Sequence, residues 1–88
     1  MHELREQYDG PARISSTEVD VRLRGHFEPI DGLFHWWGRV ASHEGITAEH
    51  SPGDEVTLVT PHGEATGRLT DLDPWGRFRV SGAGRPPF

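Results

Sequence analysis

Apolar and polar residues alternate along the segment from Glu18 to Ser42, and this alternation predicts a β-hairpin. One side of each predicted strand is apolar. These residues are Val19, Val21, Leu23, Gly25 and Phe27 on the first strand, and Phe34, Trp36, Gly38 and Val40 on the second. The sequence between the strands, Pro29-Ile30-Asp31-Gly32, favours a tight turn, because Asp-Gly readily adopts the positive φ angles of a type I′ turn.

The hairpin has two alternative registers that keep both apolar sets on one face. Either Asp31-Gly32 or Ile30-Asp31 is the two-residue loop, whereas a slip of one residue would place Phe27 and Phe34 on opposite faces. Under both alternatives the other face gathers the same six side chains: Arg22, Arg24, His26, His35, Trp37 and Arg39. The hairpin is therefore predicted to bury one face and to present a polar face that also holds a tryptophan.

The rest of the chain predicts four more short strands separated by turns. The strands lie near residues 12–15, 56–60, 64–72 and 77–81, and the turns near 8–11, 16–17, 51–54, 61–63 and 73–76. Residues 1–8 are interpreted as a short helical turn or a frayed end, and residues 42–51 as a loop or one helical turn around Ile46. Residues 82–88 are interpreted as a strap packed over the sheet with Phe88 in the core, or alternatively as a lid over a pocket.

These elements predict an all-β protein in which residues 1–88 form a single domain. About six short strands without a helical period indicate a small antiparallel sheet that curves into a partly open barrel. Glycines at positions 25, 38 and 67 would permit the bending. The predicted core consists of Val21, Leu23, Phe27, Phe34, Trp36, Val40, Val56, Leu58, Leu69, Phe78 and Val80.

Composition excludes several classes of protein. The chain has 88 residues and no cysteine, so it holds neither disulfides nor thiolate zinc sites. A net charge of −5 argues against a general nucleic-acid binder. No apolar run is long enough to span a membrane, and the N-terminal residues lack the features of a secretory signal. We therefore expect a cytoplasmic protein that binds neither nucleic acid nor membrane.

Four segments of the chain resemble a known family. YDGPA, VRLRGHFEPIDGLFHWWGRV, VTLVTPHGEATGRL and DPWGRFRVSGAGRPPF are similar to the actinobacterial domain of unknown function family numbered 4873, and the resemblance covers residues 8–88. Members of that family occur alone and as C-terminal extensions of proteins similar to flavin-dependent monooxygenases. The resemblance implies a role beside redox or small-molecule tailoring chemistry, with a flavin-dependent oxygenase as a partner, and assigns no role to individual residues. No Gly-rich dinucleotide fingerprint is present, so no cofactor is predicted for this chain.

The polar face of the hairpin is the main candidate site. Arginine forks bind carboxylate or phosphate, and an indole stacks on planar rings, so the predicted ligand-binding residues are Arg22, Arg24, Trp37 and Arg39, together with Glu28. His26 and His35 are the candidate acid–base catalysts, because histidine exchanges protons near neutral pH. The alternative interpretation is a solvated face on which the arginines pair with Asp20 and Glu28. Trp37 favours a site, since it requires a cover, and the predicted covers are residues 42–51 and the C-terminal strap.

Two further groups of residues have weaker signals. The histidines at 26, 35, 43, 50 and 62 lack the tight spacing of metal ligands, so no metal site is predicted. Asp71 and Asp73, close to Trp75 and Arg77, are paired carboxylates suited to acid–base work, but an aspartate at this position more often stabilises a turn.

Three classes of function follow from these observations. The preferred hypothesis is a small accessory module of tailoring metabolism that binds a planar or anionic ligand or a tailoring-enzyme partner. The second is a small cofactor-independent enzyme of the cyclase or isomerase type, in which His26 or His35 transfers a proton and Arg24 or Arg39 stabilises charge. The third is a structural homodimer joined through an edge strand or an aromatic patch.

Overall fold

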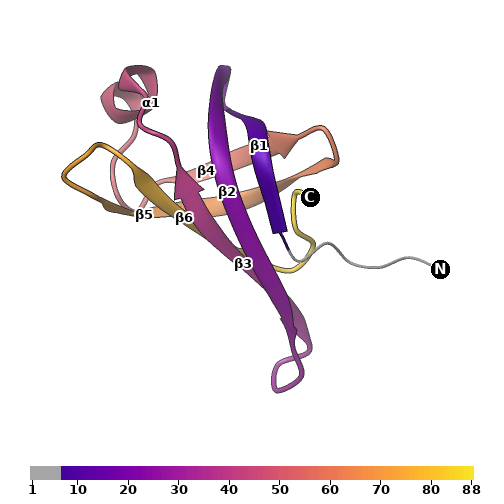
Figure 1. The fold of residues 1–88 in the computed structure, drawn as a ribbon. Coiled ribbons are helices and arrows are strands. Elements are labelled where there is room, and N and C mark those ends of the chain that lie inside the picture. The colour runs from indigo at the N-terminus through magenta and orange to yellow at the C-terminus, as the bar shows by residue number, and fades with distance from the viewer. Residues whose placement is uncertain (1–6) are drawn as a thin grey trace.

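The chain folds into a closed six-stranded antiparallel barrel in the computed structural model, which describes residues 7–88 (Figure 1). The elements are β1 (Gln7–Ile14), β2 (Thr17–Glu28), β3 (Leu33–Val40), α1 (Glu44–Glu49), β4 (Glu55–Thr60), β5 (Gly63–Leu72) and β6 (Phe78–Ala83). Around the barrel the order is β1, β2, β3, β6, β5, β4. The predicted all-β barrel of six strands is confirmed, and a short ladder between β1 and β4, at Arg13 and Ile14, closes it.

The hairpin of β2 and β3 has the register centred on Ile30 and Asp31. Phe27 lies opposite Phe34 and Glu28 lies opposite Leu33, so the loop contains four residues, 29–32. The register of the Ile30-Asp31 alternative is therefore confirmed and that of Asp31-Gly32 is wrong, but the loop has four residues and not two. The physical reason is Pro29, which has no N–H to donate to a closing pair with Gly32. The Gly32 N–H instead donates to the carbonyl oxygen of Glu28 at 2.9 Å, with Gly32 at a φ of 71°.

The predicted turn at residues 8–11 is wrong, because β1 runs straight through it. Tyr8 is buried, and its hydroxyl donates to the carbonyl oxygen of Pro11 at 2.5 Å. Proline is tolerated here because β1 pairs with β4 only at Arg13 and Ile14, which leaves the strand around Pro11 as an edge. The interpretation of residues 1–8 lies outside the described residues, except for Gln7 and Tyr8, which belong to β1.

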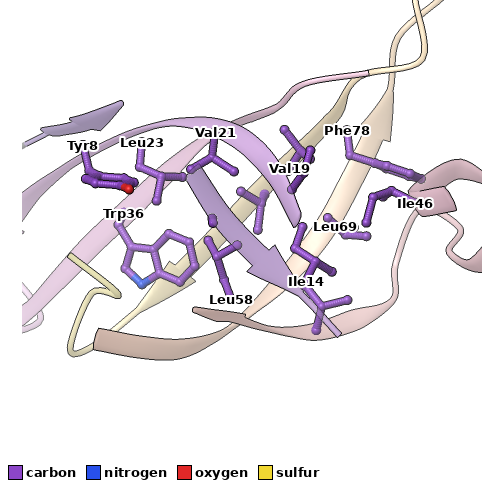
Figure 2. Packing of buried hydrophobic residues seen from close by; sticks show 14 of the residues in the cluster. Tyr8, Ile14, Val19, Val21, Leu23, Trp36, Ile46, Leu58, Leu69 and Phe78 are labelled. Carbon is purple, nitrogen blue, oxygen red and sulfur yellow. The ribbon is translucent and has the colours of Figure 1, made fainter. Parts of the chain in front are cut away.

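The barrel interior contains the predicted core with one exception (Figure 2). Phe27 is 52% exposed. The hairpin continues beyond the barrel at this point, since β1 pairs with β2 only as far as Arg24 and β6 pairs with β3 only as far as His35. No strand of the described chain faces Phe27, so the alternation that made it inward-facing does not bury it. The core also includes residues that the prediction omitted: Tyr8, Ala12, Ile14, Val19 and Ile46.

Two segments pack against the barrel interior. The predicted helical turn around Ile46 is α1, and its Ile46 side chain is buried near Phe78 (Figure 2). The C-terminal residues continue from β6, with Pro87 buried and its carbonyl oxygen accepting a hydrogen bond from the Thr60 hydroxyl. Phe88 then lies edge-on against Phe34, with ring centroids 6.4 Å apart. Through these contacts, α1 and the C-terminal residues fill part of the barrel interior.

Candidate functional site

The outer face of β2, β3 and β6 carries three rows of residues that lie directly opposite one another. From the hairpin tip towards its base, these rows are His26, His35 and Ala83; Arg24, Trp37 and Ser81; and Arg22, Arg39 and Arg79. We call these nine residues the polar face. It brings together all six residues that the hairpin pattern placed on one side, whereas Glu28 lies one row nearer the tip.

In the first row, each histidine is close to an acidic residue of the hairpin tip. His35 Nε2 lies 2.7 Å from Asp31 Oδ2, and His26 Nε2 lies 3.7 Å from Glu28 Oε2. The backbone N–H of Leu33 and the His35 ring together hold the pKa of Asp31 below its ordinary value. The histidine side chains are 55% and 37% exposed. This environment is open to water, and a general acid–base gains most from a site that excludes water.

In the second row, Arg24 is neutralised and Trp37 is half-exposed. Arg24 Nη1 donates to Asp9 Oδ1 at 2.7 Å, and this hydrogen bond holds the pKa of Asp9 below its ordinary value. Trp37 remains 41% exposed and packs edge-on against His26, with ring centroids 5.5 Å apart. Trp37 is therefore available to a ligand, whereas Arg24 serves the contact between β1 and β2.

The third row places three positive charges side by side. Like charges directly opposite one another on neighbouring strands destabilise a sheet. Arg39 is compensated by Asp73, with Nη1 and Oδ2 3.2 Å apart. Arg22 lies opposite Asp9 of β1, which is bound to Arg24, and Arg22 and Arg79 form no ion pair within residues 7–88. The row thus holds an excess of positive charge, and an anion bound there would reduce the repulsion between the arginines.

A groove of about 480 Å³ runs along β6 beside Trp37. It forms because the outward side chains of β6, Ser81 and Ala83, are small, while the neighbouring strands carry large ones. Trp37 and His35 of β3 line one side, and Arg68 of β5 lies directly opposite Ser81 on the other. Residues 42–51 do not line this groove, and of the predicted strap 82–88 only Gly82 and Ala83 do so, as part of β6. The cover predicted for Trp37 is therefore wrong, since residues 84–88 do not reach the groove. The reason is that both segments pack into the barrel interior instead.

Sequence reasoning missed Arg68 and Ser81 as residues of this groove. Their alternation within β5 and β6 marked them as outward-facing, but nothing local revealed that β6 lies between β3 and β5. A second hollow, of about 570 Å³, lies at the base of the hairpin, where Arg22, Arg39 and Arg77 approach Asp9 and Asp20.

The remaining histidines are dispersed. His43 caps α1, with its Nδ1 accepting the Gly45 N–H at 3.0 Å, and His50 Nδ1 lies 3.5 Å from Asp54. His62 lies edge-on against Tyr8, with ring centroids 5.5 Å apart. Within residues 7–88, no three side chains of the kinds that hold metals come together.

Asp73 organises the turn between β5 and β6. Its Oδ1 accepts the backbone N–H groups of Trp75 and Arg77, each at 2.9 Å, and its Oδ2 accepts Arg77 Nε at 2.8 Å. Burial raises the pKa of Asp73, but these hydrogen bonds from Arg77 and Trp75 more than offset it, so the pKa lies below its ordinary value. The geometry favours the structural interpretation of this aspartate, and Asp71 does not take part in the turn.

The lowered pKa values predict how stability depends on pH. A carboxyl group whose pKa is depressed in the folded state stabilises the protein fully above its unfolded pKa of about 4, and this stabilisation is lost as pH falls through the folded value. Asp73→Asn should therefore lower the urea midpoint at pH 7 and make the midpoint less sensitive to pH below about 4. Urea titrations followed by circular dichroism across this range would measure both effects. Asp71→Asn is the matched control, and an acid limb equally steep for Asp73→Asn and the parent would contradict the prediction.

The fold and the polar face together define a small closed β-barrel with an open, arginine-rich and aromatic surface. The chain matches the family model described as "Domain of unknown function (DUF4873)" over residues 5–88, and it belongs to this family. It is 38% identical over 86 residues to uncharacterized proteins of Mycobacterium tuberculosis (strain ATCC 25618 / H37Rv) and Mycobacterium bovis (strain ATCC BAA-935 / AF2122/97). The matches cover 92% of this chain and 24% of those relatives, so the chain spans about a quarter of their length.

No solved structure matches the chain. Among the described residues, no helix has the length and apolar character needed to cross a membrane.

Proposed function

We propose that the protein is an accessory module of small-molecule tailoring metabolism that binds a planar, anionic ligand in the groove along β6. The observation that carries this proposal is the position of a half-exposed tryptophan and an arginine on opposite sides of a groove with a small-residue floor. Trp37, Ser81 and Arg68 lie in one row across three neighbouring strands. The groove volume of about 480 Å³ lies within the range of small-molecule sites.

The three residues supply complementary interactions. The Trp37 indole offers an apolar surface for stacking against a planar ring. The Arg68 guanidinium offers paired donors for a carboxylate or phosphate, and its present partner, Glu55, is 3.6 Å away in an exposed and therefore weak ion pair. Ser81 adds a hydroxyl that donates or accepts. A ligand that carries an acid beside a planar ring would use all three, and the Arg22–Arg39–Arg79 row would attract it electrostatically.

A binding role is better supported than catalysis at this face. His26 and His35 lie on adjacent strands, but each faces its own acidic partner and both are exposed to water. The longer relatives are consistent with a module that works beside other protein regions, in which this domain supplies the ligand contact.

The test is a titration with planar aromatic carboxylates, with affinities measured by calorimetry for every variant and the indole N–H signal of Trp37 followed in NMR spectra of the variants that keep this residue. Arg68→Gln and Trp37→Ala should each weaken binding about tenfold or more, equivalent to about 1.4 kcal/mol. Arg13→Gln is a matched control, because Arg13 is similarly exposed and pairs with Glu18 at 3.7 Å on another part of the barrel. If no probe shifts the Trp37 signal, or if Arg13→Gln weakens binding as much as Arg68→Gln, the proposal is wrong.

A further inference from the structure

The outer face of the β2–β3 hairpin changes its charge from base to tip. Four rows of two residues follow one another along it: Arg22 and Arg39, Arg24 and Trp37, His26 and His35, and Glu28 and Leu33. The tip then adds Ile30 and Asp31. Figure 1 shows that this hairpin extends well beyond the other strands. We call these four rows with the tip the hairpin strip; it is basic at its base and acidic at its tip.

The hairpin strip also exposes large apolar side chains. Ile30 is 93% exposed, Leu33 44% and Trp37 41%, and Phe27 is 52% exposed on the reverse side of the same hairpin. Apolar residues that gather on one projecting element, rather than scattering singly over the surface, mark an interaction surface. The strip therefore combines apolar contact area with an ordered arrangement of charge.

We propose that the hairpin strip is a self-association surface on which a second copy of the chain lies antiparallel. A two-fold axis through the centre of the strip, between the second and third rows, brings the first row of one copy onto the fourth row of the other. Arg22 and Arg39 then meet Glu28 and Leu33 of the partner subunit, and the arrangement is repeated symmetrically. The second row, Arg24 and Trp37, meets the third row of the partner in the same way.

Charge complementarity favours a second copy as the occupant of this surface. Arg22 lies directly opposite Asp9 of β1, but the Asp9 carboxylate is bound to Arg24, and Arg22 forms no ion pair within the described residues. A second carboxylate opposite Arg22 would therefore reduce the repulsion between Arg22, Arg39 and Arg79. A parallel arrangement would place like charges on like charges, and a uniformly acidic partner would be repelled by Glu28 and Asp31. The antiparallel arrangement places the basic first row of each copy on the row that contains Glu28 of the other copy.

The dimer should be weak and sensitive to salt. One two-stranded strip offers less contact than a stable complex, which buries about 800 Å² per partner. Exposed ion pairs are screened by salt, so raising the ionic strength should favour the monomer. The hairpin strip shares Trp37 and His35 with the ligand groove, so a dimer and a ligand would compete for these two side chains. The test of the dimer therefore uses Arg22 and Glu28, which do not line the groove.

The experiment is a charge exchange measured by sedimentation at protein concentrations from about 10 μM to about 1 mM, where small interfaces dissociate. The parent should form a concentration-dependent dimer. Arg22→Glu alone and Glu28→Arg alone should each weaken it at least tenfold, because each places like charges opposite one another twice. An equimolar mixture of the two variants should restore dimerisation, because both contacts between the unlike subunits then join opposite charges.

Arg13→Glu is the control for an added negative charge, since Arg13 lies on β1 outside the strip, and it should leave the dimer unchanged. Circular dichroism of each variant confirms that it is folded. A parent that stays monomeric over the whole concentration range overturns the proposal. A mixture that remains monomeric overturns it as well, because the antiparallel register requires the exchange to work. Neither result decides the ligand titration, because the Arg68→Gln variant tests the groove and Arg22 and Glu28 lie outside its lining.

Discussion

Trp36→Ala should destabilise the protein severely. Trp36 is 1% exposed and is among the largest side chains of the core. Replacing a buried tryptophan by alanine costs about 3–5 kcal/mol, and a domain of this length has a total stability of only about 4–13 kcal/mol. The variant should therefore lose between about a quarter and all of its stability. A urea titration followed by circular dichroism would measure this loss.

The fit around Trp36 explains why the cavity would not collapse easily. The indole packs against the backbone of two glycines of neighbouring strands, since a Cβ atom at Gly82 would lie 2.4 Å from the ring and one at Gly67 would lie 2.7 Å from it. The buried Nε1 of Trp36 has no hydrogen-bond partner within the described residues, so packing rather than a hydrogen bond holds the ring. A barrel whose strands are fixed by ladders on both sides has little freedom to fill the space.

Trp37→Ala provides the control, because it removes the same side chain from the next position of the same strand. Trp37 is 41% exposed, and surface substitutions usually change stability by no more than about 0.5 kcal/mol. The two variants should therefore differ by several kcal/mol. If Trp37→Ala were the unstable variant and Trp36→Ala kept the urea midpoint of the parent, the assignment of inner and outer faces in β3 would be reversed.

The alternation of residues in the central hairpin was sufficient to predict both faces of β2 and β3. A strand has a side-chain period of two, so the six residues of the polar face could be grouped before their register was known. The pattern does not say where the neighbouring strands end, however. Phe27 follows the inward pattern but extends past β1 and β6, and it is therefore exposed rather than buried.

The groove could not be predicted from the sequence because it depends on strand order. The sequence predicts that Trp37 requires a cover, but the residues that share its row, Ser81 and Arg68, come from strands more than thirty positions later in the chain. Local sequence patterns identify which residues point outward. They do not identify which outward-facing residues become neighbours on adjacent strands. The same limit applies to the closure of the barrel, where β1 meets β4 through only two residue pairs.

Gly38→Ala should destabilise the protein by about 3 kcal/mol or more, at the upper end of the effects of overpacking. Gly38 lies on β3 opposite Leu23 of β2, and a Cβ atom there would be 1.9 Å from the carbonyl oxygen of Arg22. That oxygen belongs to the backbone of a paired strand, so it cannot move aside as a flexible side chain would. The substitution must separate β2 from β3 at the base of the hairpin.

Gly45→Ala is the matched control, because the nearest atoms to a Cβ at Gly45 belong to a side chain, the ring of His43 at 3.1 Å, and not to the backbone of a paired strand. Alanine is also the better helix former, so this variant should stay within about 1 kcal/mol of the parent or become slightly more stable. Equal urea midpoints for the two variants would contradict the close approach of β2 and β3.

Since Gly38 lies between Trp37 and Arg39, the separation of β2 from β3 in Gly38→Ala should also shift the NMR indole signal of Trp37. That shift would link the packing of this glycine to the geometry of the polar face, because the rows of the face are held in register by the same two strands.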